Sequence, residues 1–220
     1  AIPSYTDAFF ETMSGFTTTG ASILSDIESL PHGLLFWRSL THWLGGMGII
    51  VLSLAILPLL GIGGMQLFAA EVPGVIKDKI HPRVKETAKR LWGIYVILTA
   101  AETLLLMVGG LNFFDAITHS FATMGTGGFS TKNNSIAYFT SPYVQYVLIF
   151  FMFIAGMNFT LHYFSFHGNF SFLKTNTEFK YYLGFTVFVS LFVMIIHIPH
   201  VDFHWEEGIR QSLFHVVSLV

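Results

Sequence analysis

A sixteen-residue pattern occurs twice in this chain, and the two copies align without a gap. Residues 7–22 read DAFFETMSGFTTTGAS and residues 115–130 read DAITHSFATMGTGGFS, at a constant offset of 108. Five of the sixteen positions are identical. Each copy consists of a short apolar segment followed by a tetrad of Thr and Gly residues. A repeat at so long a period indicates that one structural unit is used more than once, so we expect a repeated architecture.

The composition indicates that this unit lies in a membrane. Apolar residues make up 53% of the chain and charged residues only 11%, whereas a soluble domain carries about 25% charged residues. Four apolar segments approach or exceed the roughly 20 helical residues that cross a bilayer: 34–60, 91–111, 143–166 and 181–198. Three shorter ones reach about half-way across: 4–16, 113–124 and 207–220. Backbone that ends inside a membrane must be buried in protein or face water, so we expect the short segments to be re-entrant pore helices.

The basic residues predict which side of the membrane each loop occupies. Of the eleven Lys and Arg residues, six lie between residues 65 and 90 and two lie between residues 167 and 180. Cytosolic loops carry an excess of Lys and Arg, so these two loops are predicted to be cytosolic. The three half-helices would then all enter from the outside.

The predicted fold class is an all-α membrane protein built from repeated helix–pore loop–helix units. Residues 213–220 (LFHVVSLV) align with residues 9–16 (FFETMSGF), so a third tetrad is expected directly after Val220. The chain starts at Ala1 without an initiator Met or a targeting segment, and we expect it to be an internal piece of a longer protein. The predicted divisions are 1–64 (pore helix, filter and inward helix of a first repeat), 65–90 (cytosolic basic loop), 91–166 (a complete second repeat), 167–180 (cytosolic loop) and 181–220 (outward helix and pore helix of a third repeat).

The two tetrads have the residue types that an ion filter requires. A pore replaces the hydration shell of a cation with backbone carbonyls, and Gly allows the positive φ angles that such a segment needs. The C-terminal ends of the half-helices carry partial negative charge, which favours a cation. One tetrad alone would more often be an ordinary turn after a helix, but two aligned copies argue against that reading. The predicted filter residues are Thr17, Thr18, Thr19, Gly20, Gly125, Thr126, Gly127 and Gly128.

Three motifs in combination resemble the Trk/Ktr/HKT superfamily of potassium transporters, and the bacterial Trk-type pore subunit most closely. They are RSLTHWLGGMG at 38–48, GTGGFS at 125–130 and AGMNF at 155–159. The resemblance implies four repeats around a pseudo-fourfold pore, one filter glycine per repeat, a homodimer and a cytosolic ring of nucleotide-binding regulatory subunits. It also implies a multi-pass protein of the bacterial inner membrane. Compared with that pattern, the chain lacks the first helix of repeat one and everything after the third pore helix, including the family's gating loop.

The leading hypothesis is selective, channel-like transport of a monovalent cation, with potassium favoured. Potassium is the transported ligand, and the backbone carbonyls of Thr18, Thr19, Thr126 and Gly127 are expected to hold it. The alternative is a broken-helix secondary transporter for a small solute, or a sodium-coupled symporter. Broken-helix transporters of anions aim the N-termini of half-helices at the ligand, whereas here the C-termini lead into the tetrads.

Other classes of function find no support in the sequence. No catalytic motif is present, so no enzyme activity is expected. The chain has no cysteine and no polybasic tail, which excludes thiolate metal sites and argues against a nucleic-acid partner. We expect no cofactor.

A few residues outside the tetrads are candidates for supporting roles. Arg38 either braces the filter loop or extends to the lipid headgroups. Glu102, inside a predicted span, is expected to make a structural hydrogen bond to a neighbouring helix, with a permeation or proton pathway as the alternative. Asn158 either faces the inner vestibule or bridges two helices. Gly45 and Gly46 are expected to permit a close helix contact or a bend.

Overall fold

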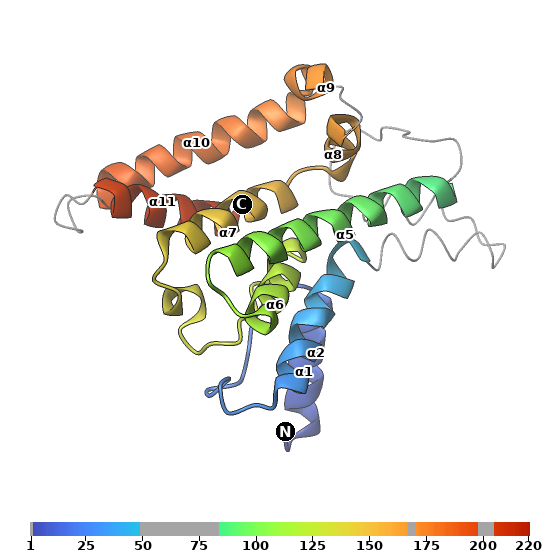
Figure 1. Ribbon diagram of the computed structural model, residues 1–220, viewed down its shortest axis with the longest axis vertical. Helices are drawn as coiled ribbons and strands as arrows, with labels where there is room; N and C mark the ends of the chain where they lie inside the picture. Colours follow the sequence, from blue (N-terminus) through green and yellow to red (C-terminus); the bar gives the residue numbers. More distant parts are fainter. Residues whose placement is uncertain (1, 49–83, 167–169, 198–204) are drawn as a thin grey trace.

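The computed structural model describes residues 2–48, 84–166, 170–197 and 205–220, and all regular secondary structure in these ranges is helical. The protein is thus an all-α membrane protein, as predicted. The helices, drawn in Figure 1, are α1 (Tyr5–Phe16), α2 (His32–Trp43), the π-helical turn η1 (Leu44–Gly48), α5 (Val84–Val108), α6 (Phe113–Met124), the 3-10 turn η3 (Ser135–Tyr138), α7 (Pro142–Ala155), α8 (Phe159–Phe166), α9 (Phe170–Thr175), α10 (Thr177–His197) and α11 (Trp205–Leu219).

Each of the half-length helices packs against neighbouring helices. In Figure 1, α1 and α2 lie side by side at the N-terminal end, α6 lies against α2, and α5 crosses above α6. At the other end, α11 lies between α10 and α7. One core cluster joins α5, α7 and α8 around Tyr95, which is fully buried, and a second joins α5, α6 and α7 around Leu106 and Val144. Helices α5, α6, α7 and α8 therefore share an apolar core, against which Trp43 of α2 and Phe214 of α11 also pack.

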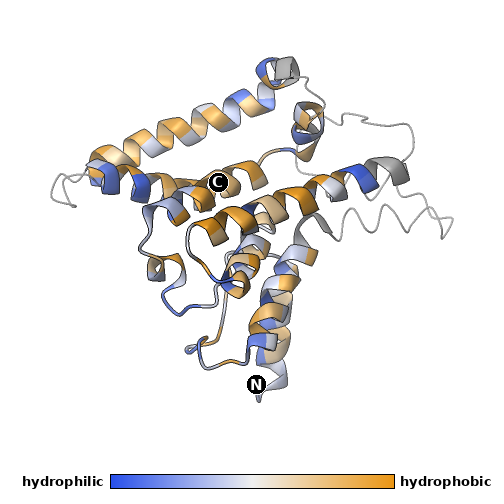
Figure 2. Cartoon of the chain, in the orientation of Figure 1, coloured by the Kyte–Doolittle hydropathy of each residue, from blue (hydrophilic) through white to orange (hydrophobic). Residues whose placement is uncertain are grey.

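Two of the described helical segments are long and apolar enough to cross a membrane, Lys89–Val108 and Thr177–His197. In Figure 2 the helix α10 is hydrophobic around most of its surface. Its large apolar side chains remain exposed, among them Phe188 at 70% and Ile195 at 70%. A helix that is apolar all round needs an apolar environment on every side, and lipid provides it.

The three half-length helices are confirmed close to their predicted bounds. Helix α6 spans Phe113–Met124, α1 spans Tyr5–Phe16 and α11 spans Trp205–Leu219. The helices α6 and α1 start in the same way. The Ser4 hydroxyl accepts from the Asp7 N–H at 3.4 Å, and the side-chain oxygen Oδ1 of Asn112 accepts from the Asp115 N–H at 2.8 Å. These side chains satisfy amides that the first helical turn leaves free. The 108-residue repeat thus extends to the helix caps.

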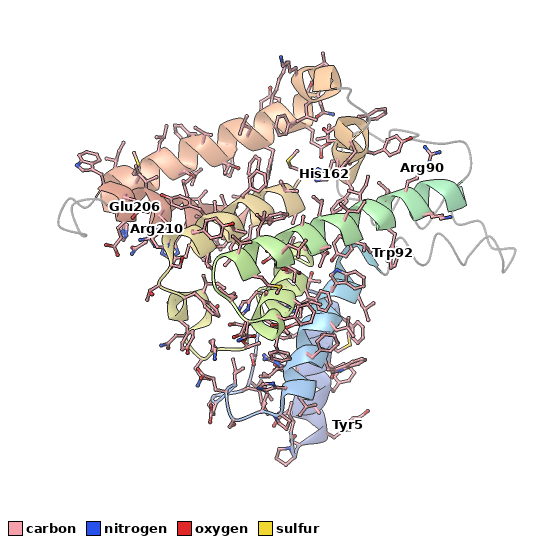
Figure 3. All side chains as sticks on the ribbon, viewed as in Figure 1. Tyr5, Arg90, Trp92, His162, Glu206 and Arg210 are labelled. Carbon is pink, nitrogen blue, oxygen red and sulfur yellow. The ribbon has the colours of Figure 1, made fainter. Side chains whose placement is uncertain are left out.

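Helix α11 is held by a polar contact to the second repeat. Arg210 and Glu206 lie next to one another on α11 (Figure 3), with Nε of the arginine 2.9 Å from the carboxylate. Arg210 also donates to the side-chain oxygen of Gln145 on α7. This arginine is 9% exposed, so its charge is compensated within the protein.

The prediction of one continuous span over 143–166 is wrong. The chain is helical from Pro142 to Ala155 and again from Phe159 to Phe166, with a break at 156–158. Asn158 starts the second piece, since its carbonyl accepts from the Leu161 N–H at 2.9 Å. Apolar composition alone did not reveal the break, because the sequence is predominantly apolar on both sides of it.

The predicted loop boundaries also differ from the helix ends. Helix α5 starts at Val84, inside the segment assigned to the first cytosolic loop, and α9 with the start of α10 occupies most of 170–180. The predicted inward span over 34–60 is seen as α2 followed by η1 up to Gly48. The remainder of that span, and residues 65–83 of the basic loop, lie outside the described residues.

The glycines after α2 are used for close contact and for a bend, as predicted. A Cβ on Gly45 would overlap the Phe16 carbonyl, and a Cβ on Gly46 would come within 2.9 Å of the Gly125 Cα. Gly46 has ψ of -118°, which kinks the helix. The backbone after α2 therefore lies directly against the ends of both α1 and α6.

Candidate functional site

The first tetrad, residues 17–20, has a backbone of alternating handedness. Thr17 lies at φ -83° and ψ 0°, Thr18 at φ 54°, and Gly20 at φ 73°. Thr19 is not among the residues with positive φ. A β-branched residue at positive φ is a genuine outlier, and such strain costs about 1–3 kcal/mol. The surrounding structure must therefore hold Thr18 in place.

The second tetrad, residues 125–128, repeats this conformation. Gly125 lies at φ -77° and ψ -4°, Thr126 at φ 53° and Gly128 at φ 83°. Each value is within about ten degrees of its counterpart 108 residues earlier. The left-handed threonine is thus a property of the repeated unit.

The amide groups of both tetrads are bonded to the pore helices. The N–H groups of residues 17, 18 and 19 donate to the carbonyls of residues 13, 15 and 14 at 2.8, 3.1 and 3.0 Å. Those of residues 125, 126 and 127 donate to residues 121, 123 and 122 at 3.0, 2.9 and 2.9 Å. The Thr17 hydroxyl adds a bond to the Met13 carbonyl at 2.7 Å. The same set of backbone hydrogen bonds therefore ends each pore helix and fixes the following tetrad to it.

The carbonyl oxygens of the tetrads remain free in the described part of the chain. None of them accepts a hydrogen bond there from a protein donor. Successive residues of opposite handedness gather their N–H groups on one side, and here that side faces the pore helix. The carbonyls are left for the other side, where they can replace water around a cation.

The two tetrads are in direct contact. A Cβ on Gly20 would overlap the carbonyl oxygen and carbon of Gly127. The eight predicted filter residues therefore lie in two adjoining backbone segments, 17–20 and 125–128, which we call the filter strands. The potassium-holding residues predicted from the sequence, Thr18, Thr19, Thr126 and Gly127, lie in these strands.

A buried ion pair supports the first tetrad. Arg38 on α2 and Glu11 on α1 are 2.8 Å apart, with side-chain exposures of 8% and 4%. The Glu11 carboxylate also accepts from the Ser22 hydroxyl at 2.9 Å and from the Ile23 N–H at 3.2 Å. Arg38 is thus tied, through Glu11, to residues that directly follow the first tetrad.

A histidine bridge occupies the equivalent place in the second repeat. His119 Nδ1 is 2.7 Å from the Asp115 carbonyl, and its Nε2 is 2.9 Å from the Ser130 hydroxyl. The Asp115 carboxylate also accepts from the Thr131 hydroxyl at 2.6 Å. His119 is the counterpart of Glu11 in the sixteen-residue alignment. Sequence reasoning missed this pair, although two polar residues at one position of two apolar half-helices were the available signal.

The loops that follow the tetrads are joined at their outer ends. The Asn133 side chain accepts from the Ile27 N–H at 2.7 Å and donates to the Asp26 carboxylate at 3.2 Å. The Asn133 N–H donates to Glu28 at 3.2 Å. The hydrogen bond from Asn133 holds the pKa of Asp26 below its usual value. These contacts join the first repeat to the second at the surface.

The other two candidate residues have different environments. Glu102 on α5 is fully buried near Thr123, and neither carboxylate oxygen has a hydrogen-bond partner among the described residues. No hydrogen bond of ordinary geometry reaches Glu102 there, although the Thr123 side chain of the neighbouring helix α6 lies close enough to interact with the carboxylate. The Asn158 amide donates to Glu178 on α10 at 3.4 Å, which is the helix-bridging alternative.

Comparison with known proteins identifies the family. The model of the TrkH family, described as cation transport proteins, matches residues 2–205. The chain belongs to the TrkH family. The match covers both tetrads, both pore helices that precede them and the first residue of α11.

Relatives within the TrkH family carry names of potassium transporters. The Trk system potassium uptake protein TrkH of Escherichia coli K12 is 48% identical over 97% of this chain and 45% of its own length. TrkG of the same organism, also named a Trk system potassium uptake protein, is 45% identical over 73% of this chain and 33% of its own length. The crystal structure of the potassium transporter TrkH from Vibrio parahaemolyticus superposes with a TM-score of 0.81 at 39% identity, covering 98% of this chain and 44% of that one. The chain thus spans about 45% of the length of the TrkH relatives that it matches.

Proposed function

We propose that this chain forms two walls of a potassium-selective, channel-like pathway across the membrane. The observation that carries the proposal is the repeated backbone of residues 17–20 and 125–128, with bonded amides and free carbonyls. Rigidly held carbonyls replace the water that a dehydrated cation loses. The relatives' names favour potassium as that cation.

The sign of the transported charge follows from the pore helices. Both α1 and α6 lead into their tetrads with C-terminal ends, where the helix dipole is negative. This polarity favours a cation and disfavours the alternative of a broken-helix transporter for an anion. Sodium-coupled symport has no specific observation in its favour. We propose no enzymatic role and no cofactor.

The assembly is proposed by extension from the repeat. Two walls are one half of a pseudo-fourfold pore. Residues 1–64 would contribute the pore helix, filter and inward helix of a first repeat, residues 91–166 a complete second repeat, and residues 181–220 the outward helix and pore helix of a third. We propose a multi-pass protein of the bacterial inner membrane, with the basic loop 65–90 and the loop 167–180 in the cytosol. A homodimer and a cytosolic nucleotide-binding ring are the partners expected of the assembled transporter.

Substitution of a filter glycine tests the proposal. In the full-length protein, Gly128→Ser should lower the ratio of potassium to sodium permeability, measured from reversal potentials in liposomes. Gly128 has φ 83° and open space around it, so the added side chain strains the backbone without a steric clash. Gly110→Ser is the matched control, because Gly110 has φ 95°, open space and a place in the α5–α6 loop. An unchanged ratio in Gly128→Ser would refute the filter assignment, as would a wild-type protein with no preference for potassium over sodium.

A further inference from the structure

The residue directly after the second filter glycine is inserted into the first repeat. Phe129 is 4% exposed. Its ring lies 4.2 Å from the guanidinium carbon of Arg38 and 3.9 Å from the ring centre of His42, with 20° between the two planes. The Phe129 N–H also points at His42 Nδ1, 3.4 Å away. The phenyl ring is thus held by a cation and an imidazole from α2.

The two side chains that hold this ring are themselves fixed. Arg38 is tied to Glu11 by the buried ion pair and donates to the Ser22 hydroxyl at 3.2 Å. His42 is fully buried one helical turn further along α2. A Cβ on Gly15 of α1 would lie 3.7 Å from the edge of the Phe129 ring. The pocket for the ring is therefore built from the same residues that support the first tetrad.

The ring pocket also adjoins the filter backbone. A Cβ on Gly127 would overlap the His42 imidazole, so this ring lies directly against the second tetrad. The Gly127 carbonyl in turn contacts Gly20 of the first tetrad. Any shift of Phe129 or His42 is therefore transmitted to carbonyls in the contact between the two strands.

We propose that Phe129 is a positioning residue that determines specificity by locking the second filter strand to α2 of the first repeat. This inference rests on the proposed function. Carbonyl filters discriminate between cations by the positions and number of their oxygens, and a site must be held to about 0.5 Å to work as designed. The counterpart of Phe129 in the first repeat is Ala21, which is exposed. Between these two repeats, the second therefore inserts a ring into the first, whereas the first has only a methyl group at the equivalent position.

The test is Phe129→Leu in the full-length protein, with reversal potentials measured in liposomes. The potassium-to-sodium permeability ratio should fall about fivefold, the change that loss of one aromatic or cation–π contact makes in an equilibrium. Phe151→Leu is the control, because Phe151 is 3% exposed and lies in the core of α5, α7 and α8. This control should lower the melting temperature and leave the ratio unchanged. A merely structural role for Phe129 would give the same result as Phe151.

Two further variants keep the outcome unambiguous. If Phe129→Leu yields no folded protein, Phe129→Met is judged by the same ratio, because its unbranched side chain has about the volume of Leu and adapts better to an aromatic-shaped gap. An unchanged ratio in the variant that folds overturns the inference. If Gly128→Ser lowers the ratio while the Phe129 variant does not, the filter assignment stands and only the lock is wrong. If neither lowers it, the filter assignment is refuted as well.

Discussion

Replacing the two filter glycines by alanine should have unequal effects, although their backbones are alike. Gly20 and Gly128 lie at φ 73° and 83°, where an L residue costs about 1–2 kcal/mol. Around Gly128 an added Cβ meets no atom within 4 Å. Gly128→Ala therefore bears only the backbone strain. If the backbone relieves that strain by turning the carbonyl of residue 128, the ratio of potassium to sodium permeability should fall by about fivefold to thirtyfold.

At Gly20 a steric overlap adds to this strain. The Cβ would lie inside the contact distance of the Gly127 carbonyl oxygen, which is backbone and cannot rotate away as a side chain can. Relief requires one filter strand to move away from the other. We expect Gly20→Ala to abolish discrimination between potassium and sodium and to lower the melting temperature by more than Gly128→Ala does.

The assay is the reversal potential of the purified full-length protein in liposomes, with melting temperatures in detergent measured in parallel. Gly110→Ala serves as control, since Gly110 at φ 95° also has open space but lies in the loop before α6. Gly110→Ala should lower the melting temperature by about as much as Gly128→Ala does and leave the permeability ratio unchanged. The reasoning is refuted if Gly128→Ala is as damaging to selectivity as Gly20→Ala, or if Gly110→Ala changes the ratio.

Three further predictions concern charged groups. Glu11→Ala should destabilise the protein by about 3–5 kcal/mol, because it leaves Arg38 as an unpaired buried charge. Denaturant unfolding measures the change in the free energy of unfolding, and a decrease below about 1 kcal/mol would contradict this prediction. The Asp26 carboxylate, whose pKa is lowered by Asn133, should hold the outer loops together at pH values above its unfolded pKa of about 3.9 and release them as pH falls through its lower folded pKa. Hydrogen exchange of the loop should become faster as pH falls through this range. The variant Asp26→Asn should not show this pH dependence. Glu102→Gln should be tolerated or stabilising in a thermal melt, since a buried carboxylate without a partner among the described residues is costly when ionised; a large drop in melting temperature would indicate a required charge.

Local features of the sequence were enough to predict the half-helices and their tetrads. Apolar length sets where a helix ends inside a membrane, and an Asp in the first turn with a capping residue three positions earlier marks where it begins. The alignment also predicted glycines at positive φ. It did not predict that Thr18 and Thr126 would share that conformation, because threonine has no intrinsic preference for it.

Side-chain partners were harder to predict. The bridges from Glu11 to Ser22 and from His119 to Ser130 join residues only 11 positions apart, yet they require the tetrad to reverse the chain. At the break at 156–158, the Asn158 amide donates to Glu178 and α8 packs beside α5. Hydropathy contains neither piece of information.

The sequence by itself determined the repeated unit and its place in a membrane, and it predicts the residues of the candidate filter. These depend on composition, length and backbone freedom, which are properties of short segments. Only the tertiary structure decided how the two filter strands are held together. The contacts of Phe129 with Arg38 and His42, and of Gly20 with Gly127, join residues roughly ninety or more positions apart. Such contacts form because α2 packs on both pore helices, and no local pattern specifies that packing.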